Sequence, residues 1–335
     1  MPKRTLPRRC ALLTLAALII TAFGVCAHSD YPDNEKEYFC WTGLGIFTGN
    51  VTYQIGGHFV DPSQQLDEIA PFPVSKLQFP LNVTIVTFGN EFSLNKHFEI
   101  RGEVTKNITT YAGKMSDTDY LYPGQLTQIY SSNDSDVQTI TTDIGFRYWV
   151  SRQDAENMHI KFGLGGAMLY EHFEWRLSNL NQFNYYDDNG NQIIPAKQTV
   201  QSGLIGAYES TTNMPYLEAA TEFDQTDAFS LLISVGYSPF AQVSDEDNHI
   251  LRQFAVTTNL TGSAYKLCVE AKYNLSKSWI LMGKWDWISF NLTGTDSAFF
   301  YGTANKEFNQ AETWTYQHEI SSTQSILTFS LAKKF

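Results

Sequence analysis

The sequence of 335 residues contains few cysteines and fewer basic than acidic side chains. Of its four cysteines, Cys40 and Cys268 lie within expected strands, where a bridge between them would need an improbable coincidence of position. We therefore expect both to be unpaired. With 23 Lys and Arg against 35 Asp and Glu, the net charge is −12, which argues against nucleic-acid binding and favours encounter with basic peptides.

Long apolar runs are also missing, except for one near the N-terminus, Cys10 to Phe23. A basic head precedes this run, and Val25 and Ala27 are small residues at positions −3 and −1 of a possible cleavage site. We expect residues 1–27 to be a secretory signal peptide; its four basic residues would leave with it, taking the net charge from −12 to −16. A membrane anchor is one alternative, but the run is shorter than the ~18–20 residues of a spanning helix. A lipoprotein processed at Cys26 is the other, and its flanking residues fit that processing poorly.

The usual signatures of metal, nucleotide and serine-hydrolase chemistry are absent as well. The histidines have no Cys or His partners at metal-ligand spacing. There is no G-x-S-x-G elbow and no phosphate-binding glycine loop. We therefore expect no metal and no nucleotide cofactor.

What the sequence does contain is period-two alternation, most clearly in its last segment, 321–335. Leu327, Phe329, Leu331 and Phe335 share one parity, and small or polar residues occupy most of the other. This pattern predicts a strand with one apolar face. An aromatic residue that ends the chain on such a face resembles the closing strand of bacterial outer-membrane β-barrels.

The same alternation recurs along the chain, and we expect ten strands. They lie around residues 37–54, 74–92, 98–109, 140–148, 158–176, 216–223, 229–237, 265–273, 281–287 and 321–335. Short and long connections alternate, and long loops are expected at 111–136, 178–201, 238–252 and 293–320. This rhythm is typical of barrels with short periplasmic turns and long external loops. The predicted fold is all-β, a ten-stranded antiparallel transmembrane β-barrel over residues 28–335 with five extracellular loops.

The cost of placing charge in lipid decides which parity faces the membrane. Turning Lys266 or Lys284 toward lipid would cost about 2–4 kcal/mol each at the midplane. The charged parity should therefore face the lumen, and the Trp, Tyr and Leu parity the lipid. The lumen set comprises Glu99, Arg101, Glu103, Arg147, Lys266, Glu270, Lys284 and Asp286. Such a lumen would fill with its own ion pairs, which argues against a channel. A soluble β-sandwich would alternate too, but it does not require this loop rhythm.

Two acidic clusters carry the candidate chemistry. They are Asp117-Thr118-Asp119 and the segment 245–249, D-E-D-N-H. In so acidic a chain, solvated loop carboxylates are the simplest explanation of either cluster alone. Asp247 and His249 stand at i and i+2, however, so in an extended segment the carboxylate can orient the imidazole as a general base. A facing carboxylate pair could then hold a water ready to attack a peptide carbonyl.

These motifs resemble those of the omptins, outer-membrane endopeptidases of Gram-negative bacteria. The matching segments are L-G-I-F-T-G at 44–49, V-S-K-L at 74–77, D-T-D at 117–119, N-M-P-Y at 213–216 and D-E-D-N-H at 245–249. The resemblance implies a ten-stranded barrel with an active site in a groove at its outer end. It also implies that Asp117 and Asp119 bind the attacking water, that His249 is the general base and that Asp247 orients it. The implied reaction uses no metal and forms no covalent intermediate.

The sequence departs from the family in its expected binding positions. The family's pocket for a basic residue uses two acidic side chains; Asp245 fits one position, but Tyr53 occupies the other. Cleavage beside Arg or Lys is therefore only half supported. Family activity also depends on lipopolysaccharide held on the outer barrel wall, so dependence here is either weaker or satisfied by other residues. The aligned positions are Glu171, Phe173, Thr211 and Ser263, of which Glu171 alone is retained.

Two classes of function follow from these expectations. The first is a monomeric surface endopeptidase of the outer membrane, acting on peptide or protein substrates with its active site facing the outside. The alternative is a non-proteolytic barrel that acts as an adhesin, an invasin or a structural protein. The presence of all four candidate catalytic residues favours the endopeptidase.

Overall fold

The computed structural model describes residues 37–61, 66–69, 72–122, 126–155, 158–187, 189–225, 228–251, 253–300 and 315–335. The strands are β1 (Glu37–Asp61), β2 (Leu66–Ile69), β3 (Ser75–Pro80), β4 (Val83–Asn95), β5 (Phe98–Asn107), β6 (Tyr111–Tyr122), β7 (Leu126–Ala155), β8 (Met158–Tyr186), β9 (Gln192–Gln225), β10 (Phe229–His249), β11 (Phe254–Asn274), β12 (Trp279–Phe300) and β13 (Thr315–Lys334). The expected signal peptide lies outside the described residues. Within them, no helix is long and apolar enough to span a membrane.

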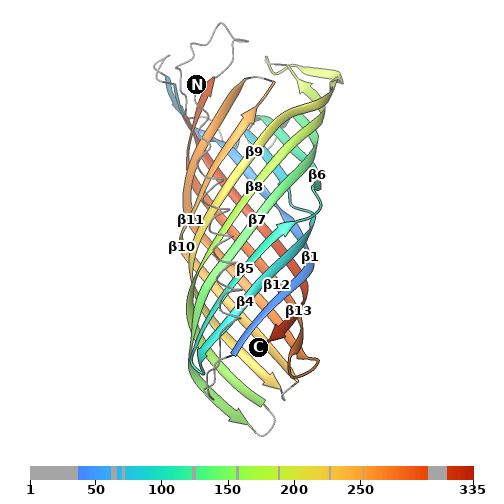
Figure 1. The fold of residues 1–335 in the computed structure, drawn as a ribbon. Helices are drawn as coiled ribbons and strands as arrows, with labels where there is room; N and C mark the ends of the chain where they lie inside the picture. The colour runs from blue at the N-terminus through green and yellow to red at the C-terminus, as the bar shows by residue number, and fades with distance from the viewer. Residues whose placement is uncertain are drawn as a thin grey trace, which may run out of the picture.

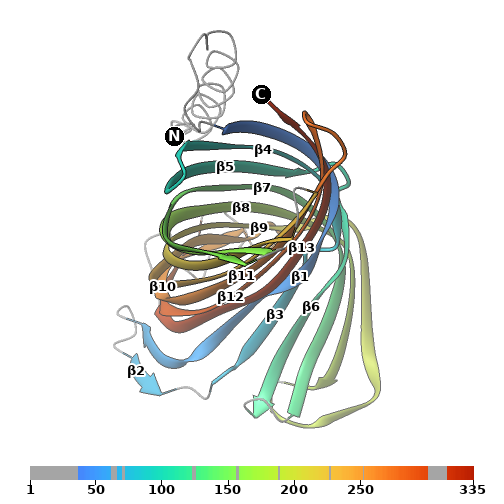
Figure 2. The same ribbon diagram turned by 90° about the horizontal axis from the view of Figure 1, so that it is seen from below.

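The strands form one antiparallel sheet that closes on itself through β1 and β13. These two strands pair from Phe39 with Lys334 at one end to Val60 with Thr315 at the other. The closed path runs through β1, β4, β5 and β7 to β13, which are 10 strands around a ring that is not evenly round (Figures 1 and 2). The prediction of an all-β antiparallel barrel is confirmed, and the number of membrane-spanning strands stays a prediction. In the following, the lower end is the one that carries the C-terminus in Figure 1.

The expected strand 74–92 is divided into β3 and β4 where the barrel wall changes neighbours. β3 pairs with β1 over 50–55, and β4 pairs with β1 over 37–47, so β3 lies above β4. In the same way, β5 pairs with β4 in the lower wall, whereas β6 pairs with β3 in the upper wall. This arrangement carries Asp117 and Asp119 on β6 to the upper end of the barrel.

Most of the segments expected to be long loops are strands instead. β6 and the start of β7 occupy most of 111–136, and β8 and β9 extend through most of 178–201. β10 continues to His249, and β12 and β13 occupy the described parts of 293–320. The predicted loops are therefore wrong in extent. Above an apolar belt both faces of a strand can be polar, so the alternation disappears while the ladder of backbone hydrogen bonds continues.

The two faces of the lower wall have opposite character. Outward-facing side chains include Leu44, Leu217 and Phe329, which are 59%, 72% and 64% exposed. Lys266 and Lys284 are buried in the interior. The predicted register, with the charged parity inward, is confirmed. Among the described residues, neither Cys40 nor Cys268 is in a disulfide.

Ion pairs fill the lower interior. Arg147 contacts Glu99 at 3.0 Å and Glu218 at 2.8 Å. Lys284 contacts Glu103 at 2.8 Å and Asp286 at 3.0 Å. This confirms the expectation that the lumen charges pair with one another.

A buried aromatic layer separates these ion pairs from the upper end. Phe173 lies 5.9 Å from Phe47 and 5.2 Å from Trp175, measured between ring centroids. Phe79 stacks on Tyr208 at 4.3 Å, and its centroid is 5.3 Å from that of Trp175. Close-packed rings are stiff, and they therefore form a firm support for the side chains above them.

Candidate active site

Asp247 and His249 lie together at the upper end of β10. The Oδ2 atom of Asp247 is 3.1 Å from the Nε2 atom of His249. The imidazole also stacks on Phe254, its partner across β11, with 4.3 Å between ring centroids. The Asp247 side chain is buried, whereas that of His249 is 30% exposed. The imidazole is thus held by two neighbours while part of it remains accessible.

Asp117 and Asp119 reach the same region from β6. The Ser75 hydroxyl of β3 donates a hydrogen bond to Oδ1 of Asp117 at 3.2 Å. The pKa of Asp117 is raised to about 7, mainly by burial and then by the negative charges of Asp119 and Asp247, whereas His249 and the Ser75 hydrogen bond lower it. Since Asp247 and His249 act on Asp117, the structure brings the two expected pairs into one site. None of the four lies in a loop: Asp117 and Asp119 are within β6, and Asp247 and His249 end β10.

Asp245 lies deeper in the barrel on the same side of β10. Its Oδ2 atom accepts a hydrogen bond from the Tyr208 hydroxyl at 2.8 Å, and the residue is only 5% exposed. Burial raises the pKa of Asp245 to about 7. Hydrogen bonds from Tyr208 and Thr258 lower it, while Asp247 and Asp296 raise it. Asp245 therefore retains its proton to a much higher pH than an ordinary carboxyl group.

Tyr53 connects the groups of the site. It is buried on β1, and burial raises the pKa of its hydroxyl well above the usual value. The charges of Asp247, Asp296, Asp245 and Asp117 raise it further, in that order. Tyr53 therefore lies within the electrostatic reach of both carboxylate clusters.

His318, which lies in a segment expected to be a loop, completes the floor of the site. Its imidazole is fully buried and packs edge to face on Tyr53, with 4.0 Å between ring centroids. Its Nδ1 atom is 2.8 Å from Oγ1 of Thr258, and its Nε2 atom is 3.9 Å from Oδ2 of Asp245. Burial lowers the pKa of His318 to about 3, against the opposing effect of Asp247.

A signal for His318 was present in the sequence. His318 falls within the expected loop 293–320, but the structure places it on β13. Ile320, Ser322 and Gln324 share its parity, and all three are buried. Extending the alternation of the closing strand upward predicts that His318 points inward.

Asp296 is also buried, and its Oδ1 atom accepts a hydrogen bond from the Tyr316 backbone N–H at 2.6 Å. No pattern in the sequence around Asp296 indicates this burial.

Among the described residues, no group of three or more His, Cys, Asp or Glu side chains has the arrangement of a metal site.

The chain also matches the model of a known protein family. The model of the omptin family matches residues 70–328, which is well over half of the chain. The chain belongs to the omptin family. The matched range contains Asp117, Asp119, Asp247 and His249, and it begins after Tyr53.

One solved structure shows the fold that this omptin shares. The outer membrane protease OmpT from Escherichia coli superposes with a TM-score of 0.71 at 17% identity, over 92% of this chain and 99% of that chain. The outer membrane protein OprG from Pseudomonas aeruginosa gives a TM-score of 0.35 at 8% identity, over 90% and 97%. The translocator domain of the autotransporter NalP from Neisseria meningitidis gives 0.31 at 10% identity, over 98% of each chain. No curated protein sequence matches the chain.

The positions expected to contact lipopolysaccharide divide between the two faces of this omptin. Glu171 is fully buried and accepts a hydrogen bond from Gln324 at 3.1 Å, and Phe173 belongs to the aromatic layer. Their assignment to the outer wall is wrong, because alternation along β8 turns both inward. Thr211 is half-buried, and its hydroxyl lies 3.0 Å from Nδ1 of the neighbouring His172.

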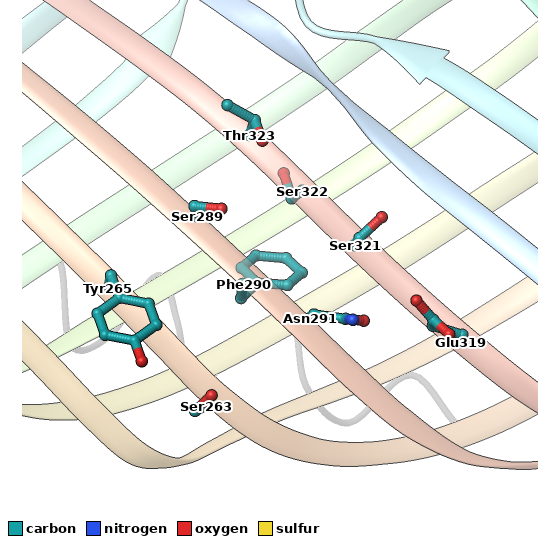
Figure 3. Close-up of a pocket in the computed structure, with 9 residues that line it drawn as sticks. All are labelled: Ser263, Tyr265, Ser289, Phe290, Asn291, Glu319, Ser321, Ser322 and Thr323. Carbon is teal, nitrogen blue, oxygen red and sulfur yellow. The ribbon is translucent and has the colours of Figure 1, made fainter.

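Ser263, the fourth expected contact, lines a surface hollow on the outer wall of the omptin barrel. The hollow has a volume of about 310 Å³ and lies over β11, β12 and β13 (Figure 3). It is lined by Ser263, Tyr265, Ser289, Phe290, Asn291, Glu319, Ser321, Ser322 and Thr323. None of the candidate catalytic residues lines it, so it is separate from the site.

Proposed function

We propose that this omptin is an endopeptidase of the bacterial outer membrane. After removal of residues 1–27, residues 28–335 would cross the membrane as a monomeric ten-stranded antiparallel barrel. The exposed apolar side chains of the lower wall support this placement. The upper end, with its carboxylates, would face the outside of the cell and meet peptide or protein substrates there.

In the proposed reaction, His249 acts as the general base. Asp247 accepts a hydrogen bond from Nε2–H of His249, which leaves the lone pair of the imidazole on Nδ1. Asp117 and Asp119 hold a water, and His249 takes a proton from it while the water oxygen bonds to the peptide carbonyl carbon. The C–N bond then breaks, and the leaving amine receives the proton from the imidazolium.

The observation that carries this proposal is the meeting of two separate pairs. The contact of 3.1 Å between Asp247 and His249 supplies an oriented base. The effect of both residues on the pKa of Asp117 indicates that the water-binding carboxylates are close to that base. The strands that carry the two pairs, β6 and β10, do not pair with each other in the described sheet. A structural role in the sheet alone would not explain why these side chains converge.

Peptide cleavage by the refolded barrel tests the proposal. A peptide library is incubated with the wild type with and without added lipopolysaccharide, and cut sites are mapped by mass spectrometry. We expect His249→Ala and Asp119→Asn each to slow cleavage by about 10²–10⁴-fold. His172→Ala, which removes a partly exposed histidine of the outer wall, is the matched control and should cleave at the wild-type rate.

The arms of this experiment separate the alternatives. We propose that lipopolysaccharide supports activity, so cleavage should be faster when it is present; equal rates would contradict that part. A correctly folded wild type that cuts no peptide under either condition would refute the endopeptidase and leave an adhesin, an invasin or a structural barrel.

A further inference from the structure

The floor of the candidate site is closed by side chains from the two strands that meet at the barrel closure. His318 of β13 is fully buried, and Tyr53 of β1 is 2% exposed. The edge-to-face contact between their rings, 4.0 Å from centroid to centroid, places aromatic atoms next to Asp245. Tyr208 closes another side, with its centroid 6.0 Å from that of Tyr53.

Hydrogen bonds determine how His318 faces Asp245. Thr258 acts on both groups: its Oγ1 is 2.8 Å from Nδ1 of His318, and its hydroxyl lowers the pKa of Asp245. When the single hydrogen of that hydroxyl is directed at Asp245, Nδ1–H of His318 donates to Oγ1 of Thr258. This tautomer directs the Nε2 lone pair toward Oδ2 of Asp245, 3.9 Å away. Among the described residues, neither Nε2 of His318 nor Oδ1 of Asp245 has a hydrogen-bond partner.

The 3.9 Å between Nε2 and Oδ2 is too long for a hydrogen bond, and the two groups lie together without repulsion when Asp245 is protonated. Burial raises the pKa of Asp245 to about 7 and lowers the pKa of His318 to about 3. Between about pH 3 and pH 7 the carboxyl group keeps its proton and the imidazole is uncharged, so the floor is electrically neutral. A lysine or arginine side chain entering beside His249 would thus meet rings and a neutral carboxyl group instead of an accessible carboxylate.

We infer that His318 is a specificity-determining residue: it covers Asp245, so that the site takes an uncharged apolar or aromatic substrate side chain next to the cleaved bond. This rests on the proposed function for the identity of the site. The groups buried around Asp245 are the rings of Tyr53 and His318 and the side chain of Leu77, the register partner of Tyr53 on β3. Apolar burial against these groups would supply the binding energy.

Two substitutions distinguish the covering of Asp245 by the His318 ring from other effects of this residue. His318→Ala removes the ring and opens a path to Asp245, whereas His318→Phe keeps a ring of similar size over it. We expect the Ala variant to gain about 10–100-fold in preference for a central Arg over a central Leu, because an opened carboxylate forms a charge-assisted hydrogen bond. The Phe variant should keep the wild-type preference.

Binding is measured in a His249→Ala background, so that it does not depend on catalysis. Two fluorescent peptides of equal length, with Leu or Arg at the central position, are titrated by anisotropy against the proteins that have His, Ala or Phe at position 318. Cut sites of the same three proteins are mapped in barrels that retain His249. Migration of unheated barrels on a denaturing gel verifies that every variant is folded.

Each outcome decides one of the two proposals. Wild-type cleavage beside Lys or Arg would overturn the inference and leave the endopeptidase standing. Equal preferences of the Ala and Phe variants would also overturn it. Absence of cleavage together with the expected shift in binding would refute the endopeptidase and support the role of His318. Absence of binding by either peptide to any folded variant would overturn the inference about His318, whereas the cleavage assay alone decides the endopeptidase.

Discussion

His318 on the last strand packs edge to face against Tyr53 on the first, with 4.0 Å between the ring centroids. Residue Tyr53 pairs with Ile320 in the ladder that closes the sheet, so this contact exists only when the barrel is closed. The pairing of β1 with β13 therefore both closes the barrel and forms the floor of the candidate site. A barrel whose first and last strands separate would lose both.

Removing the Ser75 hydroxyl should move the pH profile of peptide cleavage. The proposed reaction uses Asp117 in its ionised form, so kcat/KM should rise with pH through about 7, the pKa of Asp117. The hydrogen bond from Ser75 lowers that pKa, and Ser75→Ala should therefore shift the rising limb to higher pH. Profiles of kcat/KM between pH 5 and pH 9 check this. Ser289→Ala on the outer wall is the control and should leave the limb in place; a shift in the control, or none in Ser75→Ala, would contradict the assignment.

Tyr208→Phe should destabilise the barrel by about 1–3 kcal/mol at pH 8. The substitution removes the donor that lies 2.8 Å from Oδ2 of Asp245 and leaves a buried charged group with fewer partners. At pH 5 the loss should be smaller, because the carboxyl group is then protonated. Urea unfolding in detergent micelles measures both values. Tyr185→Phe, at a tyrosine that is 37% exposed, should change stability by less than about 0.5 kcal/mol.

Asp245→Asn should alter how stability depends on pH. The pKa of Asp245 in the folded barrel is about 7, above its usual value of 3.8, so the folded state holds the proton more tightly than the unfolded chain. The stability that this proton contributes is complete below pH 3.8 and is lost as pH rises toward 7. Asparagine does not titrate, so the variant should gain relative to the wild type by roughly 2–4 kcal/mol between pH 4 and pH 8. Urea titrations of both proteins at several pH values in this range measure the difference. If the free energy of unfolding depends on pH in the same way in the wild type and the variant, the raised pKa is refuted.

Arg147→Ala should be severely destabilising. The guanidinium contacts Glu99 and Glu218 at 3.0 Å and 2.8 Å, and both carboxylates are buried. Removing it leaves two buried acidic groups without this partner, at a cost of about 3–5 kcal/mol. Arg176→Ala is the control, since Arg176 is 60% exposed and pairs with Glu174 at the surface. That substitution should cost no more than about 1 kcal/mol, and equal losses in the two variants would contradict the role of the lumen ion pairs.

The lower half of this barrel was predictable from local pattern. Lys266 and Lys284 alternate with apolar residues, and the expense of charge in lipid assigns each parity to a face without any knowledge of partners. The pairing of Asp247 with His249 was predictable for a similar reason, because residues two apart on a strand share a side. Both conclusions depend on neighbours in the sequence.

The upper half was predicted poorly because its strands have polar residues on both faces. β6, which carries Asp117 and Asp119, was assigned to a loop, and so was the part of β13 that carries His318. Glu171 and Phe173 were assigned to the wrong side of β8. In these segments the backbone ladder, and not an alternating pattern, maintains the strand, and a polar sequence contains little information about the ladder.

By itself, the sequence determined the class of fold and the inward parity of the charges, because both follow from local alternation and the cost of charge in lipid. The two candidate pairs rest instead on short motifs that resemble those of the omptins. Only the tertiary structure decided that His318 lies 3.9 Å from Asp245 and 2.8 Å from Thr258. These contacts join β10, β11 and β13, and they depend on the register of paired strands. A shift of one residue in any of those ladders would turn the side chains to the other face, and nothing local in the chain specifies that register.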